Sequence, residues 1–122
     1  FYNTKSPEWD SKEIFADLSA YVIVTKSHTN VSHSLRVIQA ADIVLSPDTY
    51  AVHAASAWNI PVIGLYEPSS STMDLWRPLS DKQVQICAPA GKTVSDIGVS
   101  EVMKALDHLL TTSTSRERVF LN

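Results

Sequence analysis

Three polar segments each follow a run of apolar residues, and their side chains are of types that hold a charged ligand. They are residues 26–30, 46–49 and 67–72, rich in hydroxyl groups with one lysine and two carboxylates. A helical pattern begins after the second segment, near Thr49. The first N–H groups of a helix have no partner within the helix and favour an anion such as a phosphate. The sequence therefore predicts a site for a phosphorylated ligand where this helix begins.

A purely local role is the alternative for the second segment. Asp48 is a natural N-cap, and the hydroxyls of Ser46 and Thr49 can bond neighbouring backbone groups. We expect Asp48 to cap the helix and the helix start as a whole to bind the ligand.

Four apolar runs predict the strands that position these segments. Residues 21–25, 43–45 and 61–66 lack polar alternation, which is typical of strands buried on both faces, and we expect the first to lie centrally. Residues 83–87 alternate, which predicts an edge or half-exposed strand.

Apolar residues at helical spacing separate these runs. The first stripe, over 31–41, consists of Val31, Leu35, Ile38 and Ala41, with Asn30 or Ser32 as its cap. A second helix, over 49–58, should pack through Ala51, Ala54, Ala55 and Trp58 and end at Asn59. The clearest stripe, over 99–110, consists of Val99, Val102, Met103, Leu106, Leu109 and Leu110. A weaker helix is predicted over 11–18.

Strands that alternate with helices predict βαβ units and a parallel sheet. The expected fold class is α/β, a Rossmann-like parallel sheet flanked by helices. In such a sheet the strand-to-helix loops share the carboxyl edge, where open α/β sheets bind ligands. We expect residues 20–111 to form this domain, with 1–19 as its poorly assigned start and 112–122 as a tail.

Composition argues against several classes of protein. Ten Lys and Arg against thirteen Asp and Glu give a net charge of −3 without a basic cluster, so no nucleic-acid binding is expected. No apolar stretch approaches the roughly 20 residues of a membrane-spanning helix. Cys87 is the only cysteine, and His28 and His33 have no third ligand nearby, so we expect no disulfide and no metal site. The lone cysteine fits a reducing compartment, the cytoplasm.

The second polar segment belongs to a longer pattern. Residues 41–57 read Ala-Asp-Ile-Val-Leu-Ser-Pro-Asp-Thr-Tyr-Ala-Val-His-Ala-Ala-Ser-Ala, and residues 60–66 read Ile-Pro-Val-Ile-Gly-Leu-Tyr. This pattern resembles the C-terminal half of glycosyltransferase family 9, the bacterial heptosyltransferases. That family has an Asp-Ser/Thr-Gly-x-x-His-x-Ala-x-Ala signature, then a Pro-Val strand and a Gly-Pro-Thr loop. The matching residues are Asp48, Thr49, His53, Ala55, Ala57, Pro61, Val62 and Pro68.

The resemblance implies the C-terminal domain of a GT-B fold, which binds a nucleotide diphosphate sugar as donor. The donor-binding residues that it implies are Lys26, Ser46, Asp48, Thr49, Tyr50, Ala51, His53 and Glu67. The catalytic base and the site for a glycan or lipid-linked acceptor would lie on a missing N-terminal domain. Because the chain begins with Phe1, we expect a fragment that is inactive alone.

The same resemblance implies a role in lipopolysaccharide or surface-glycan synthesis, in the cytoplasm or at the periphery of the inner membrane. It implies no cofactor, because the nucleotide sugar is the substrate.

Two departures from the family pattern keep other functions open. Tyr50 stands at the glycine of the signature, and Glu67 stands at the glycine of the loop. A non-catalytic Rossmann-like module that binds a partner protein is therefore an alternative. A sugar-nucleotide epimerase-like domain is another, although residues 53–55 replace the pair of glutamates that such a domain would carry.

Five other side chains have local interpretations. We expect Trp58 to be a packing residue, Trp76 to be a packing residue or a sugar platform near the cleft, and Cys87 to be a small buried side chain. His108 is expected on the exposed side of its helix. Arg77 is expected to pair with a phosphate or with Asp74.

Overall fold

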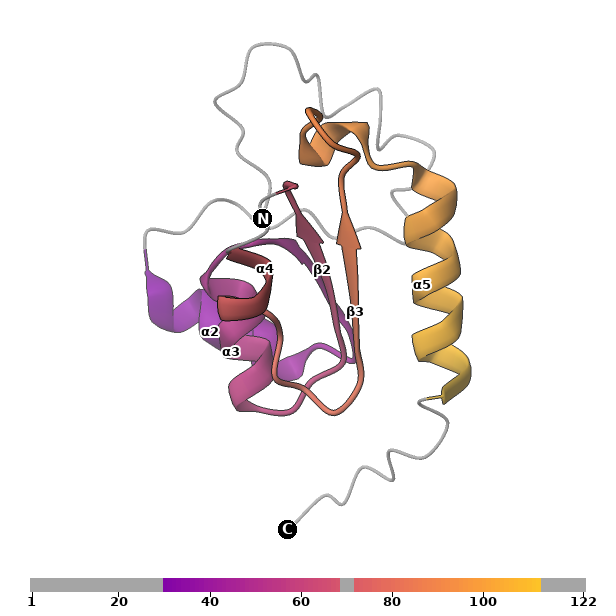
Figure 1. Cartoon of the computed structure of the whole chain (residues 1–122). Helices are drawn as coiled ribbons and strands as arrows, with labels where there is room; N and C mark the ends of the chain where they lie inside the picture. Colours follow the sequence, from indigo (N-terminus) through magenta and orange to yellow (C-terminus); the bar gives the residue numbers. More distant parts are fainter. Residues whose placement is uncertain (1–29, 69–71, 113–122) are drawn as a thin grey trace, which may run out of the picture. The chain divides into compact units, whose positions relative to one another are not determined.

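The computed structural model describes residues 30–68 and 72–112 of the chain. Figure 1 shows their elements, which are α2 (Val31–Ala40), β1 (Val44–Pro47), α3 (Tyr50–Ala57), β2 (Val62–Tyr66), α4 (Thr72–Leu75), β3 (Gln83–Cys87), the 3-10 helix η1 (Val94–Asp96) and α5 (Val99–Thr112). The chain divides into two compact units, residues 1–34 and 35–122, and of the first only 30–34 are described. The predicted strand over 21–25 and helix over 11–18 lie outside the described residues.

The three described strands form a parallel sheet in the order β1-β2-β3. Val62 of β2 pairs with Val44 of β1 on one side and with Gln83 of β3 on the other. Four of the five residues of the middle strand are buried, as its unbroken apolar sequence predicts. The predicted parallel α/β fold is confirmed.

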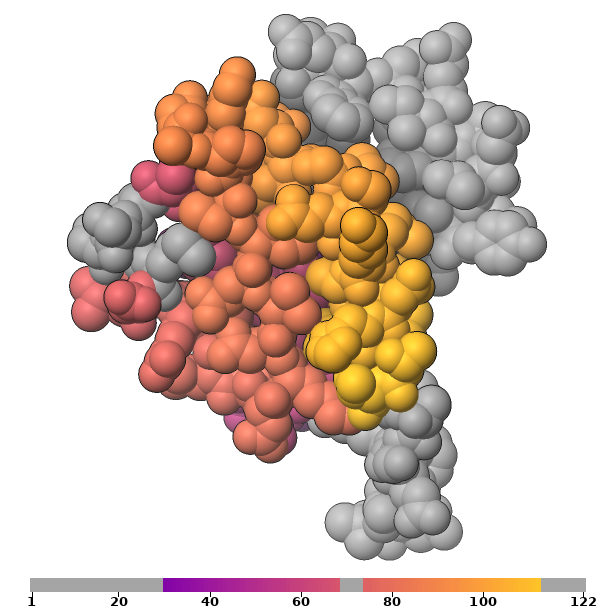
Figure 2. Space-filling model, turned by 45° about the vertical axis from the view of Figure 1, so that its right-hand side comes forward, coloured from indigo at the N-terminus to yellow at the C-terminus, as the bar shows by residue number. Residues whose placement is uncertain are grey.

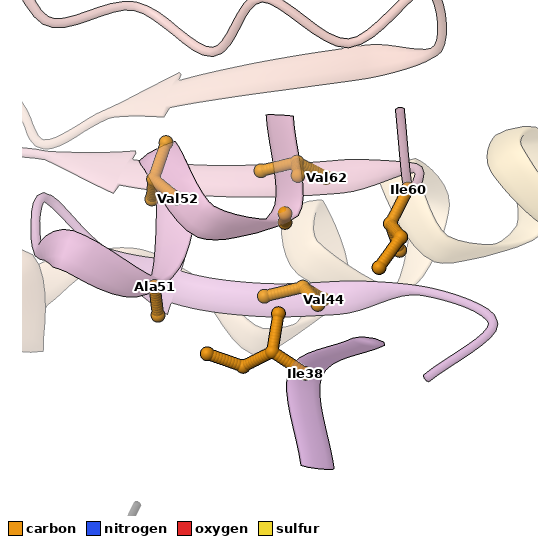
Figure 3. Packing of buried hydrophobic residues seen from close by; sticks show 7 residues of the cluster. Ile38, Val44, Ala51, Val52, Ile60 and Val62 are labelled. Atoms are coloured by element: carbon orange, nitrogen blue, oxygen red, sulfur yellow. The ribbon is translucent and has the colours of Figure 1, made fainter. Parts of the chain in front are cut away.

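Each face of the sheet carries its own hydrophobic cluster, because successive side chains of a strand point to opposite faces. The cluster on the α3 side consists of Ile38, Val44, Ala51, Val52, Ala55, Ile60 and Val62, most of which Figure 3 shows. The cluster on the α5 side consists of Ile63, Ile86, Ala105 and Leu109. Figure 1 accordingly shows α3 and α5 on opposite faces. This two-layer burial fixes the strand register and hence the position of every loop at the carboxyl edge.

The buried faces of the helices differ in part from those predicted. In α3 the buried residues include Val52 and exclude Trp58, which is 37% exposed at the helix end. In α5 the buried positions are Ala105 and Leu109, with Val102 and Leu106 packed beside them. In both helices alanines lie among the buried positions, where a small side chain allows a close approach to the sheet.

Large apolar side chains of α5 remain exposed on the outer side of the helix. They are Val99, Met103 and Leu110, all of which the sequence predicts to be in the core stripe. Figure 2 shows α5 at the surface, beside the residues of β3. The prediction for these three positions is wrong, because one helix packed on one sheet buries only a narrow stripe.

The ends of α2 and α5 are held by specific hydrogen bonds. The Asn30 carboxamide oxygen accepts from the Ser32 amide at 2.9 Å, so Asn30 is the cap of the first turn, and Val31 is exposed. At the C-terminus of α5 the Lys82 amine donates to the Thr112 carbonyl. The negative end of the helix dipole also favours a cation at this position. No helix in the described ranges is long and apolar enough to cross a membrane.

Candidate functional site at the start of α3

Thr49, not Asp48, is the N-cap of α3. Its backbone is extended, with φ −143° and ψ 173°, and its Oγ1 accepts from the Ala51 amide at 3.3 Å. The Asp48 amide instead donates to the Leu65 carbonyl at 3.1 Å, which prolongs the pairing of β1 with β2 by one residue. Because Asp48 still belongs to the sheet edge, the predicted Asp48 cap is wrong, and the helix begins one residue later.

A chain of hydroxyl groups fixes this turn. The Ser46 hydroxyl, buried at the end of β1, donates to the Pro47 carbonyl at 2.9 Å and lies 2.9 Å from the Thr49 hydroxyl. Because Ser46 has one proton and gives it to Pro47, Thr49 is the donor of this pair. The Thr49 oxygen also accepts from the Ala51 amide, so two of the predicted phosphate donors already have partners within the protein.

Tyr50 has an ordinary backbone conformation at the position where the family signature has glycine. Asn59, at φ 53°, is the one non-glycine residue with positive φ within the described ranges, so Tyr50 needs no glycine-like backbone. Its side chain is 49% exposed. Any obstruction of a ligand by this residue therefore comes from the phenol group and not from the backbone.

Negative side chains lie at the carboxyl edge of the sheet beside the α3 start. Asp48 follows β1 and Glu67 follows β2, and both are exposed. The pKa of the phenol of Tyr66, the last residue of β2, is raised to about 12. The larger cause is burial of the phenol, and the smaller is the negative charge of Asp48. Tyr66 therefore remains a neutral hydrogen-bond donor at neutral pH.

Trp76 approaches α3 from a loop that follows α4. Its indole packs edge-to-face on the His53 imidazole, with 5.7 Å between ring centroids and 69° between planes. Its carbonyl accepts from the Tyr66 hydroxyl at 3.2 Å. The Trp76 side chain is 51% exposed and packs on His53, so it is a packing residue, as predicted, although it lies at the surface beside α3.

The segment from Trp76 to Asp81 runs along α3 (Figure 1), and we call these residues, 76–81, the strap. Its Leu79 amide donates to the Ser56 hydroxyl at 3.0 Å, and Ser56 in turn donates to the Val52 carbonyl. At its far end Asp81 is bonded by Asn59, whose amide nitrogen donates at 2.8 Å and whose oxygen accepts from the Asp81 amide at 2.9 Å. The strap thus contacts α3 and its C-terminal turn at His53, Ser56 and Asn59, which are three residues apart.

Buried groups between these contacts also fix the strap. Pro78 is fully buried, and the Ser80 hydroxyl donates to the Ile60 carbonyl at 2.7 Å in a buried position. A buried backbone carbonyl needs such a partner. The strap is consequently a built part of the fold on the α3 face of the sheet.

The structure brings together part of the predicted site. Ser46, Asp48, Thr49, Tyr50, Ala51 and His53 lie in one turn and the helix that follows it, and Glu67 lies at the neighbouring strand end. Lys26 and His28 lie outside the described residues. Arg77 is exposed, and no group of three metal-ligating side chains occurs within the described ranges.

Two other expectations have separate outcomes. His108 is exposed on α5, as the sequence predicts. The free Cys87 is only half-buried at the end of β3, so the predicted buried position is wrong.

Tyr66, Gly64 and Ser56 also shape the site, and none of them was predicted to do so from the sequence. Each lies in an element that was correctly predicted, but Tyr66 and Ser56 bond to the distant strap, and Gly64 leaves room for the Tyr66 ring. A glycine inside an apolar strand was the one available signal, since it often marks the close approach of another group.

The fold and this turn define a Rossmann-like α/β protein with a polar helix start at the carboxyl edge of a parallel sheet. Comparison with known sequences gives the family: residues 8–104 match glycosyltransferase family 9 (heptosyltransferase), and the chain belongs to this family.

Two curated relatives are similar to parts of the chain. A Haemophilus influenzae protein named "Putative glycosyltransferase" is 39% identical over 70 residues, which cover 55% of this chain and 19% of the relative. An Escherichia coli K12 protein named "Putative lipopolysaccharide heptosyltransferase 4" is 30% identical over 82 residues, 63% of this chain and 22% of the relative. The chain therefore spans about a fifth of the length of these relatives. No solved structure matches the chain closely enough to count as a relative.

Proposed function

We propose that this chain is the donor-binding part of a GT-B glycosyltransferase, and that the start of α3 holds the diphosphate of a nucleotide diphosphate sugar. Family membership supports sugar transfer as the reaction. By analogy with the name of the E. coli relative, the product belongs to lipopolysaccharide or another surface glycan. The remaining enzyme would supply the acceptor site and the catalytic base.

The observation that carries the proposal is the combination of Thr49 and His53 on the open side of one helix start. Both residues are exposed, and His53 lies one turn after the N-cap. The helix dipole and the nearby amides favour an anion there. Their part in catalysis would be to stabilise the negative charge on the departing nucleoside diphosphate.

Binding of a phosphate requires a local rearrangement of hydrogen bonds. The Thr49 hydroxyl donates to Ser46, and to bind an anion it must turn its proton toward the ligand. The carboxylates of Asp48 and Glu67 would repel a diphosphate, so a cation has to balance them. Lys26, implied by the family resemblance, is our candidate for that cation.

Titration with nucleoside diphosphates tests this function. The chain would be titrated with ADP, UDP and GDP, with CMP as a nucleotide that lacks a diphosphate, and followed by NMR shifts and thermal unfolding. We expect one diphosphate to bind and its affinity to fall about tenfold in His53→Ala and Thr49→Ala, the loss typical of one charge-assisted hydrogen bond.

A matched control is His108→Ala, which removes another exposed helical histidine from the opposite face of the sheet. It should leave nucleotide binding unchanged. Absence of binding by all four nucleotides, also in Tyr50→Ala, would contradict the proposal and favour a module that binds a partner protein.

A further inference from the structure

Tyr66 is the point at which the central strand is joined to the strap. Its ring is buried, with 2% of its surface exposed, and lies against Gly64 of the same strand. Its hydroxyl donates to the Trp76 carbonyl, the first residue of the strap. The phenol therefore connects a rigid strand to a loop that borders the α3 start.

Trp76 transmits this connection to the site. Its indole packs edge-to-face on His53, the exposed residue on the second turn of α3. An imidazole on an exposed helix face has several rotamers, and an aromatic neighbour favours one of them. The Trp76 ring can orient His53 only if the Trp76 backbone is held in place. The Tyr66 hydrogen bond holds it at this end of the strap.

We propose that Tyr66 is a positioning residue, which holds the strap through Trp76 so that the indole orients His53 for ligand binding at the α3 start. The orientation of His53 by Trp76 is argued from the geometry alone. Its effect on ligand binding rests on the proposed donor site. Tyr66 itself touches no ligand in this scheme. It acts two contacts away, through Trp76 and then His53.

The rest of the strap supplies the control. Asn59 bonds Asp81 at the far end, five residues after Trp76. Asn59→Gly removes both side-chain bonds and retains the left-handed backbone, since glycine adopts φ 53° without strain. This variant loosens the strap at a distance from His53, whereas Tyr66→Phe removes the bond next to Trp76 and leaves the ring over Gly64.

The first experiment records the imidazole proton shifts of His53 by NMR in the ligand-free chain. Trp76→Leu defines the shift without the indole ring current. We expect Tyr66→Phe to move the His53 signals toward the Trp76→Leu values, and Asn59→Gly to leave them in place. Unchanged His53 signals in Tyr66→Phe, or equal changes in both strap variants, would overturn the proposal.

The second experiment measures nucleoside diphosphate affinity in the same variants. Tyr66→Phe should weaken binding about fivefold, the effect of one ordinary hydrogen bond, and Asn59→Gly should weaken it by less than twofold. Normal affinity in Tyr66→Phe would overturn the binding role even if His53 moves. Absence of binding by the unmodified chain would overturn the proposed donor site, while the ligand-free NMR shifts still decide whether Tyr66 orients His53.

Discussion

The phenol ring of Tyr66 lies so close to Gly64 that no larger residue fits at that position. A Cβ atom at Gly64 would stand 2.6 Å from Cε2 and 2.9 Å from the hydroxyl oxygen of Tyr66. The two residues are on the same face of β2, because side chains i and i+2 point the same way. Gly64 is thus required for space, and the ring occupies that space on its way to Trp76.

Gly64→Ala should destabilise the fold by about 1–3 kcal/mol, because the buried ring would have to move from its packed position. Urea unfolding measures the change in free energy. Gly98→Ala is the control, since the nearest atom to a Cβ there is 3.8 Å away, and its effect should be much smaller. Equal effects of the two substitutions would contradict the close approach of Tyr66.

Thr49→Ala should cost about 1 kcal/mol of stability through loss of the N-cap of α3. Thr49→Ser retains the hydroxyl and should restore most of it. Urea unfolding compares the stability lost in Thr49→Ala with that lost in Asp48→Ala and so shows which residue caps the helix. A larger loss in Asp48→Ala than in Thr49→Ala would show that Asp48 caps the helix after all.

Folding stability should fall between about pH 10 and pH 12 through Tyr66. The folded state keeps the phenol proton up to a pKa of about 12, whereas the unfolded chain releases it near 10. In this window the folded state binds more protons than the unfolded state, so the free energy of unfolding decreases as the pH rises, by up to about 3 kcal/mol.

Tyr66→Phe isolates this contribution from that of the other three tyrosines. Urea unfolding at pH 9 and near pH 11.5 would show a steeper loss in the unmodified chain than in Tyr66→Phe. Parallel pH dependences would mean that the phenol ionises with its ordinary pKa.

Tyr50→Ala should strengthen binding of a nucleoside diphosphate, because it removes a half-exposed phenol beside the N-cap. The backbone at this position is not left-handed, so alanine opens the site without the conformational freedom that glycine would add. NMR titration measures the affinity. Weaker binding in Tyr50→Ala would show that the phenol contacts the ligand rather than obstructing it.

The sequence alone determined the order and type of the main elements. Unbroken apolar runs at 43–45 and 61–66 and the alternating run at 83–87 predicted the three parallel strands, but burial on both faces holds only for β2, since β1 is buried at alternate residues and Leu45 is exposed. The turn from Ser46 to Thr49 and the helix after it could also be predicted from the sequence, since capping chemistry is local. The family pattern lies in this same local stretch.

Only the tertiary structure decided which local option was taken and what surrounds the site. Asp48 and Thr49 are both good caps, and the choice depended on the pairing of Asp48 with Leu65, which lies far along the chain. The strap was not predictable, because Trp76 reaches His53, and Leu79 reaches Ser56, across more than twenty residues. Sequence periodicity reports burial of a face, whereas contacts between a loop and a helix depend on how the packed layers bring distant segments together.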